Sequence, residues 1–367
     1  MNERLQALRD AGVSIWLDDL SRDRLTSGSL KALITSDGVA GVTTNPTIFA
    51  QAFADMSQYG ADLAELKAQS ATVTEAIRSL MAADVAQACD LFADVYQSSR
   101  GYDGRVSIEV DPTLAHDTAQ TVEAAQTLQS LVDRPNVMVK IPATSQGLPA
   151  IRAAVGAGIS VNATLIFSLD RYREVMEAYL GGLEDALDLG QDISNIHSVA
   201  SFFISRVDTE VDRRLDAIGT KAATDLKGKA ALANARMAYD VYLKVFESDR
   251  FAQLKAAGAN YQRPLWASTG VKNPAYPDTM YVDELVGRHC VNTMPEATLR
   301  AAADHANIAG DTVRCWIAPA TATWAQLRGI GIDYDDVTST LETEGVDKFI
   351  ASWAEVVEAV GKAMAAV

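Results

Sequence analysis

One lysine interrupts a short apolar run, and its position is the most informative chemical feature of the chain. Lys140 lies inside NVMVKIPA, from Asn136 to Ala143. It is either an edge residue whose ammonium group reaches water or a desolvated amine that stays partly neutral near pH 7. A neutral lysine can form a Schiff base with a ketone, which turns the substrate into an electron sink for carbon–carbon cleavage.

Two carboxylates could supply the proton transfers that Schiff-base chemistry requires. Period two places Ser107, Glu109 and Asp111 on one face of RVSIEVDP, and Asp18 and Asp19 lie in SIWLDDL. Carbinolamine formation, dehydration and cleavage each move a proton, which a carboxylate beside the amine can carry, directly or through an ordered water. Periodicity does not choose between the two aspartates, and either acid could instead form only a structural ion pair.

Amides and hydroxyls on neighbouring runs could bind a sugar. Asn162 and Thr164 share one face of ISVNATLIFS, and Asn45 precedes Pro46 in TTNP. The asparagine at 45 is either a loop-forming residue or an amide that hydrogen-bonds a sugar hydroxyl.

Two cations could bind an anionic substrate. Arg206 ends the run SVASFFISR, after Ser201 and Ser205, and Lys272 follows Ser268 in WASTGVKNP. Hydroxyls together with a guanidinium suit phosphate oxygens. Either cation taken alone could also be a solvated surface charge.

Eight short apolar or β-branched runs would have to position these groups, and Ala-rich amphipathic segments separate most of them. The runs span residues 14–20, 41–46, 105–112, 136–143, 159–168, 198–206, 263–269 and 289–295. Strands that alternate with helices indicate parallel βα units, and eight of them predict an α/β fold, a (β/α)8 or TIM barrel. Such a barrel carries its reactive groups at the C-terminal ends of its strands.

The chain is longer than the roughly 250 residues of a minimal barrel. We expect the surplus in two long connections, Thr47 to Gly104 and Val207 to Gln262, and in a tail after Pro295. We interpret residues 1–367 as a single domain, a barrel with extra helices in which residues 296–367 form a C-terminal helical extension. This extension either covers the rim of the barrel as a lid or packs on its base.

Composition excludes several classes of protein. The formal net charge of −16, from 32 Lys+Arg against 48 Asp+Glu, argues against nucleic-acid binding. No apolar stretch approaches the length that spans a bilayer, so we expect no membrane contact. Cys89, Cys290 and Cys315 are too few for a disulfide framework or a zinc cluster, and the N-terminus has no apolar signal core, which favours the cytoplasm.

The ordered motifs GVTTNPTIF, SIEVDP, VMVKIPAT, VNATLIFS, SFFISR, WASTGVKNP and VNTMP resemble the transaldolase family, in the longer bacterial type. The resemblance implies a (β/α)8 barrel and a class I Schiff-base mechanism that needs no metal or organic cofactor. It also implies sugar phosphate substrates. A dihydroxyacetone unit would pass from sedoheptulose 7-phosphate to glyceraldehyde 3-phosphate, giving erythrose 4-phosphate and fructose 6-phosphate, in the non-oxidative pentose phosphate pathway.

The same resemblance implies a role for each candidate residue. Lys140 is then the Schiff-base lysine, Asp18 is the acid/base, and Glu109 and Thr164 hold and activate the catalytic water. Asn45 and Asn162 bind the dihydroxyacetone unit, Ser201 lies beside it, and Arg206 and Ser268 hold the phosphate. One stretch departs from the family pattern. Many members carry ASFRN where this chain has ASTGVKN, so that Lys272 is the candidate cation in place of an arginine. An ammonium group binds phosphate as a point charge without the bidentate fork of arginine.

Three competing functions stay open at this level. A related fructose 6-phosphate aldolase would release free dihydroxyacetone, but Glu109 and Phe203 match the transferase pattern, whereas the free aldolases tend to have Gln and Tyr at these positions. Asp18, Glu109 and Asp111 could instead bind Mg²⁺ in a metal-dependent barrel enzyme. A catalytically silent sugar-phosphate binder would have no need of a lysine flanked by acids. The sequence is compatible with a monomer or a homodimer.

Overall fold

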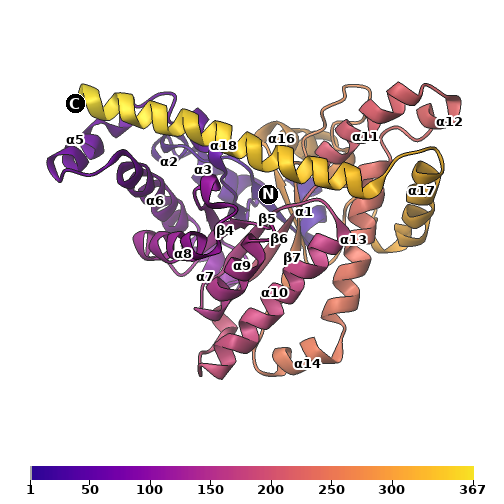
Figure 1. Ribbon diagram of the computed structural model, residues 1–367, viewed down its shortest axis with the longest axis horizontal. Coiled ribbons are helices and arrows are strands. Elements are labelled where there is room, and N and C mark those ends of the chain that lie inside the picture. Colours follow the sequence, from indigo (N-terminus) through magenta and orange to yellow (C-terminus); the bar gives the residue numbers. More distant parts are fainter. Residues whose placement is uncertain (1) are drawn as a thin grey trace.

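The computed structural model describes residues 2–367 and contains a closed barrel of eight parallel strands in sequential order, β1 pairing with β8 (Figure 1). The strands are β1 (Val13–Leu17), β2 (Gly41–Val42), β3 (Arg105–Glu109), β4 (Val137–Pro142), β5 (Val161–Ile166), β6 (Ser198–Phe203), β7 (Gln262–Ala267) and β8 (Cys290–Met294). Every strand residue is buried, as expected for a parallel sheet whose outer face is covered by helices. The predicted (β/α)8 barrel is confirmed.

The strand register places the candidate groups at one level of the barrel. Glu109 on β3 is the partner of Lys140 on β4, and Lys140 is in turn the partner of Asn162 on β5. Two positions further along, Pro142 pairs with Thr164. Three neighbouring strands therefore bring a carboxylate, an amine and an amide side by side near their carboxyl ends.

Helices connect the strands and wrap the barrel. Up to β6 the chain contains α1 (Glu3–Asp10), α2 (Arg22–Thr26), α3 (Ser29–Ala32), the π-helix η1 (Leu33–Asp37), α4 (Pro46–Ala52), the 3-10 turn η2 (Ser57–Tyr59), α5 (Gly60–Ala68), α6 (Val73–Leu91), α7 (Ala93–Ser98), η3 (Pro112–Leu114), α8 (Thr118–Val132), α9 (Gly147–Gly156), α10 (Leu169–Asp188) and η4 (Ile193–Asn195). After β6 follow α11 (Ser205–Ile218), α12 (Lys221–Thr224), α13 (Ala230–Phe246), α14 (Asp249–Ala256), α15 (Met280–Asp283), α16 (Glu296–His305), η5 (Arg314–Trp316), α17 (Ile317–Gly329) and α18 (Tyr334–Ala366).

Both long connections are helical, as predicted, and the tail forms three further α-helices and the 3-10 helix η5. The last of them, α18, runs across the molecule from α17 to the region of α5 (Figure 1). The hydroxyl of Ser352 on α18 hydrogen-bonds that of Thr47 on α4 at 2.8 Å. Since α4 follows the carboxyl end of β2, the tail covers the rim that carries the candidate residues rather than the base of the barrel. Among residues 2–367 we find no helix with the length and apolar character needed to cross a membrane.

Candidate active site

Lys140 is enclosed by the barrel and does not reach solvent as an edge residue would. Its side chain is 5% exposed, and its Nζ donates a hydrogen bond to the carbonyl oxygen of Thr44 at 3.0 Å. The same Nζ lies 3.1 Å from Oε2 of Glu109. The ring of Phe349, on α18, lies with its centroid 5.7 Å from this nitrogen. The amine is therefore near both a carboxylate on the neighbouring strand and an aromatic ring supplied by the C-terminal helix.

Glu109 and Thr164 lie behind the lysine, outside the cavity lining. Both are buried, and burial raises the pKa of Glu109 to about 7 although the charge of Lys140 opposes the rise. Within the part of the chain that the structure describes, Glu109 Oε1 and Thr164 Oγ1 have no hydrogen-bond partner. Buried polar atoms without partners are costly, so both atoms are available to hydrogen-bond a further group.

Asp18 follows β1 and is the aspartate that faces the site. Its Oδ1 accepts a hydrogen bond from the hydroxyl of Thr43 at 2.7 Å, and the hydroxyl of Thr293 lies 2.6 Å from that of Thr43. Because Thr43 has one proton to give and Asp18 takes it, Thr293 donates to Thr43. Burial raises the pKa of Asp18, while Lys140 and the Thr43 hydrogen bond lower it.

The neighbouring aspartate has a different role. Asp19 pairs with the guanidinium of Arg24 at 2.5 Å and does not line the cavity. This geometry resolves the ambiguity that periodicity leaves. Thr43 and Thr293 were not among the predicted site residues, although both lie in motifs, TTNP and VNTMP, that directly follow or end a strand.

The arrangement of carboxylates does not assemble the alternative magnesium site. Asp111 was predicted to share a face with Glu109, but its side chain caps the turn η3 and accepts hydrogen bonds from the backbone and hydroxyl of Thr113 at 2.9 and 2.6 Å. Across residues 2–367, no group of three or more His, Cys, Asp or Glu side chains is placed to hold a metal ion.

The predicted sugar-binding residues occupy two different layers. Asn45 lines the cavity and also caps α4, where its Oδ1 accepts from the backbone N–H of Ile48 at 3.0 Å. Asn162 is fully buried and does not line the cavity: it donates to Ser107 Oγ at 3.0 Å and accepts from Ser201 Oγ at 2.7 Å. Ser201 does line the cavity. Asn162 therefore orients Ser201, and any direct contact of Asn162 with a substrate stays a prediction.

The predicted phosphate-binding residues meet at the opposite end of the cavity. The placement of Arg206 at the end of a strand is wrong, because β6 ends at Phe203 and Arg206 is the second residue of α11. Its guanidinium lies 5.0 Å from the ring centroid of Phe203 and 6.0 Å from that of Phe349. Ser268, after β7, hydrogen-bonds Ser205 at 2.9 Å through their hydroxyls, and Lys272 follows in the same loop.

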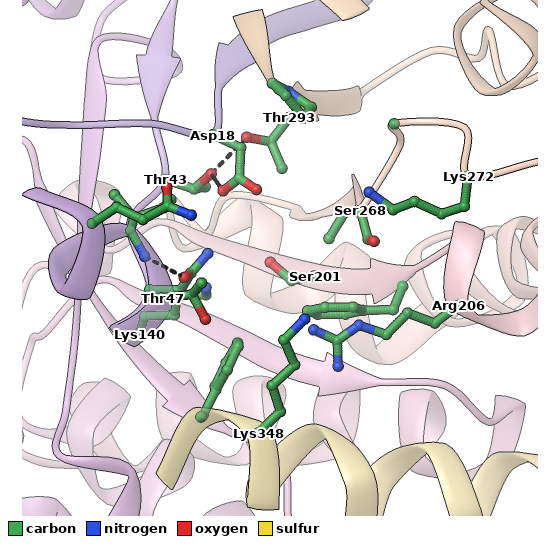
Figure 2. Close-up of a pocket in the computed structure, with 18 residues that line it drawn as sticks. Asp18, Thr43, Thr47, Lys140, Ser201, Arg206, Ser268, Lys272, Thr293 and Lys348 are labelled. Carbon is green, nitrogen blue, oxygen red and sulfur yellow. Dashed lines mark hydrogen bonds between the residues drawn. The ribbon is translucent and has the colours of Figure 1, made fainter. Parts of the chain in front are cut away.

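These groups line one cavity of about 300 Å³, shown in Figure 2, at the carboxyl ends of the strands. Its lining residues are Asp18, Thr43, Asn45, Thr47, Ile48, Gln51, Lys140, Ser201, Phe203, Arg206, Ala267, Ser268, Gly270, Lys272, Thr293, Pro295, Lys348 and Phe349. Seven of the ten predicted site residues are in this set, and Glu109, Thr164 and Asn162 lie behind it. The sequence reasoning missed Lys348 and Phe349, which come from α18 and belong to no recognisable motif.

Comparison with known proteins agrees with this geometry. A family described as transaldolase/fructose-6-phosphate aldolase matches residues 15–360. A protein of Streptomyces coelicolor named Transaldolase 1 is 59% identical over 360 residues, which cover 98% of this chain and 94% of the relative. Proteins named Transaldolase from Mycobacterium tuberculosis and Mycolicibacterium smegmatis are each 58% identical over 358 residues, covering 97% and 98% of this chain and 96% of each relative. The chain belongs to the transaldolase/fructose-6-phosphate aldolase family.

Proposed function

We propose that this protein is a transaldolase that transfers a dihydroxyacetone unit from sedoheptulose 7-phosphate to glyceraldehyde 3-phosphate through a Schiff base on Lys140. The products are erythrose 4-phosphate and fructose 6-phosphate, which places the reaction in the non-oxidative pentose phosphate pathway. The observation that carries the proposal is the buried amine of Lys140, 3.1 Å from Glu109, on the wall of a cavity that also contains Asp18. The names of the relatives at 58–59% identity support the same activity.

The first chemical step forms the Schiff base. Glu109 accepts a proton from the Lys140 ammonium, and the free nitrogen adds to the ketone carbon of the donor sugar. The resulting carbinolamine loses its hydroxyl as water when a proton returns from Glu109 through the water that Thr164 helps to hold. The product is an iminium ion on Lys140.

The second step cleaves the carbon chain. Asp18 removes the proton of the C4 hydroxyl, the C3–C4 bond breaks, and its electron pair flows to the iminium nitrogen to give an enamine. The shortened aldose phosphate leaves. The enamine then adds to the aldehyde carbon of the acceptor, Asp18 returns the proton to the new hydroxyl, and hydrolysis of the new iminium releases the product ketose and free Lys140.

The other end of the cavity suits the phosphate group. Arg206 lies in the first turn of α11, which begins without a side-chain cap, and a helix N-terminus favours anions. Ser268 offers a hydroxyl, and Lys272 supplies a point charge in place of the arginine found in many family members. We therefore place the phosphate of each substrate between α11 and the loop after β7.

The runner-up function is a fructose 6-phosphate aldolase that releases free dihydroxyacetone. Glu109 and Phe203 favour the transferase, because the free aldolases tend to have Gln and Tyr at these positions. A coupled assay of glyceraldehyde 3-phosphate release from fructose 6-phosphate separates the two activities. We expect release to depend on added erythrose 4-phosphate, and an equal rate with and without this acceptor would exclude the transferase.

The proposed chemistry uses only side chains of this protein, so we expect it to need no metal ion or organic cofactor. Full activity should persist after exhaustive chelation, whereas activity that is lost and then restored by Mg²⁺ would refute this point. The cytoplasmic location and the monomeric or homodimeric state stay predictions.

A further inference from the structure

Three cationic side chains from separate parts of the chain converge on the phosphate end of the cavity. Arg206 comes from α11, Lys272 from the loop after β7, and Lys348 from α18. Figure 2 shows the Lys348 side chain rising from the helix so that its amine lies close to the Arg206 guanidinium, with Lys272 reaching in from the other side. The chain as a whole has a net charge of −16, so a cluster of three positive charges at one end of a cavity indicates a site for an anion.

No carboxylate of the described residues pairs directly with this cluster. Within residues 2–367, none of these three cations forms an ion pair with a carboxylate within 4.0 Å. Three carboxylates interact electrostatically with Arg206 without forming an ion pair. They belong to Glu344, one turn before Lys348 on α18, and to Asp18 and Glu109 across the cavity. Lys348 is exposed, and partial desolvation together with the charges of Arg206 and Lys272 lowers its pKa, so a bound anion would stabilise its ammonium group.

The fold fixes the position of Lys348. The adjacent residue, Phe349, is 2% exposed and lies against both Lys140 and Arg206. One turn further, Ser352 is hydrogen-bonded to Thr47 on α4. Both contacts hold this segment of α18 against the rim, so the amine of Lys348 is presented to the cavity by a packed helix rather than by a free tail.

We propose that Lys348 binds the phosphate group of the sugar substrates together with Arg206 and Lys272, so that the C-terminal helix supplies one side of the phosphate site. This inference rests on the proposed transaldolase function. The ammonium of Lys348, added to that of Lys272, offsets the loss of the bidentate fork that follows from having Lys272 in place of an arginine. Lys348 is a substrate-binding residue and takes no part in the proton transfers at Lys140.

The test compares acceptors that differ only in their phosphate. In a ping-pong reaction, kcat/KM for the acceptor reports only the reaction of the acceptor with the enamine intermediate and does not depend on how the donor binds. With fructose 6-phosphate as donor, we expect Lys348→Met to lower kcat/KM for erythrose 4-phosphate by roughly 10- to 100-fold, the loss typical of a hydrogen bond to a charged group. The value for D-erythrose should stay within about twofold, and Lys348→Arg should recover part of the loss.

Lys362→Met is the matched control, since Lys362 lies on the same helix and its side chain is 75% exposed. It should change neither value. Equal losses for both acceptors in Lys348→Met would show that the substitution disturbs the helix rather than phosphate binding, and an unchanged kcat/KM for erythrose 4-phosphate would also overturn the proposal. Failure of the unsubstituted protein to transfer at all would instead refute the proposed function.

Discussion

Two glycines inside α18 have different surroundings, and the contrast tests how the helix is seated. A Cβ added to Gly345 would lie 3.0 Å from Cδ2 of Leu165 and 3.5 Å from Nη1 of Arg206. A Cβ added to Gly361 would meet nothing nearer than Cγ2 of Val73, at 3.9 Å. A glycine in a helix interior costs about 1 kcal/mol relative to alanine. We therefore predict that glycine is required for close packing at position 345 and can be replaced by alanine at position 361.

The expected magnitudes follow from these contacts. Gly361→Ala should raise the free energy of unfolding by about 1 kcal/mol, the difference in helix propensity. Gly345→Ala gains the same amount, but overpacking typically costs about 1–3 kcal/mol. Leu165 cannot move aside easily, because it is 1% exposed and its φ of 60° is fixed where the β5–β6 register shifts. The net effect at position 345 is a loss of roughly 0–2 kcal/mol.

Equilibrium urea unfolding of the unsubstituted protein and of both variants measures these differences through the shift in transition midpoint. The kcat/KM for erythrose 4-phosphate provides a second readout, and it should fall in Gly345→Ala because the new methyl group is in contact with Arg206. If both variants are stabilised by the same amount, the argument that α18 needs a close approach at Gly345 is wrong.

Two further predictions concern the proton transfers. Glu109, whose pKa burial raises to about 7, is a neutral acid below that pH and a base above it, so kcat/KM should rise as the pH increases through about 7. Glu109→Gln should abolish this rise of kcat/KM with pH and lower kcat roughly 10²- to 10⁴-fold. A kcat/KM that does not change with pH in the unsubstituted protein would contradict the acid/base role of Glu109. Thr43→Val removes the hydrogen bond that lowers the pKa of Asp18, so a smaller fraction of Asp18 is ionised and able to act as the base. Single-turnover cleavage should therefore slow roughly tenfold, and an unchanged rate would exclude a contribution of this hydrogen bond.

Much of the fold could be predicted because its signals are local. Eight short apolar runs and the Ala-rich segments between them indicate a parallel barrel without knowledge of any distant contact. The boundaries were less predictable. The run SVASFFISR continues an apolar pattern past Phe203, but the chain turns into α11 at Ser205. There the hydroxyl of Ser205 hydrogen-bonds that of Ser268, in the loop after β7. Only the tertiary fold brings those two residues together.

The site divides in the same way. Lys140 and Glu109 are conspicuous in sequence because charged residues inside apolar strands violate the usual pattern. Lys348 does not stand out in sequence, because lysines are common on amphipathic helices. It is about 200 residues after Lys140 in the chain, and only the tertiary fold brings its helix across the rim of the barrel. Asp111 was predicted to face the site, whereas the structure places it elsewhere. Residues two apart share a face only within a strand, and β3 ends at Glu109.

Reduction with borohydride in the presence of fructose 6-phosphate, followed by intact mass and peptide mapping, shows whether Lys140 forms the Schiff base. We expect a single stable adduct on Lys140, absent in Lys140→Ala and retained in Lys362→Met. Formation of no adduct, or of an adduct on another lysine while Lys140→Ala keeps its activity, would contradict the Schiff-base mechanism.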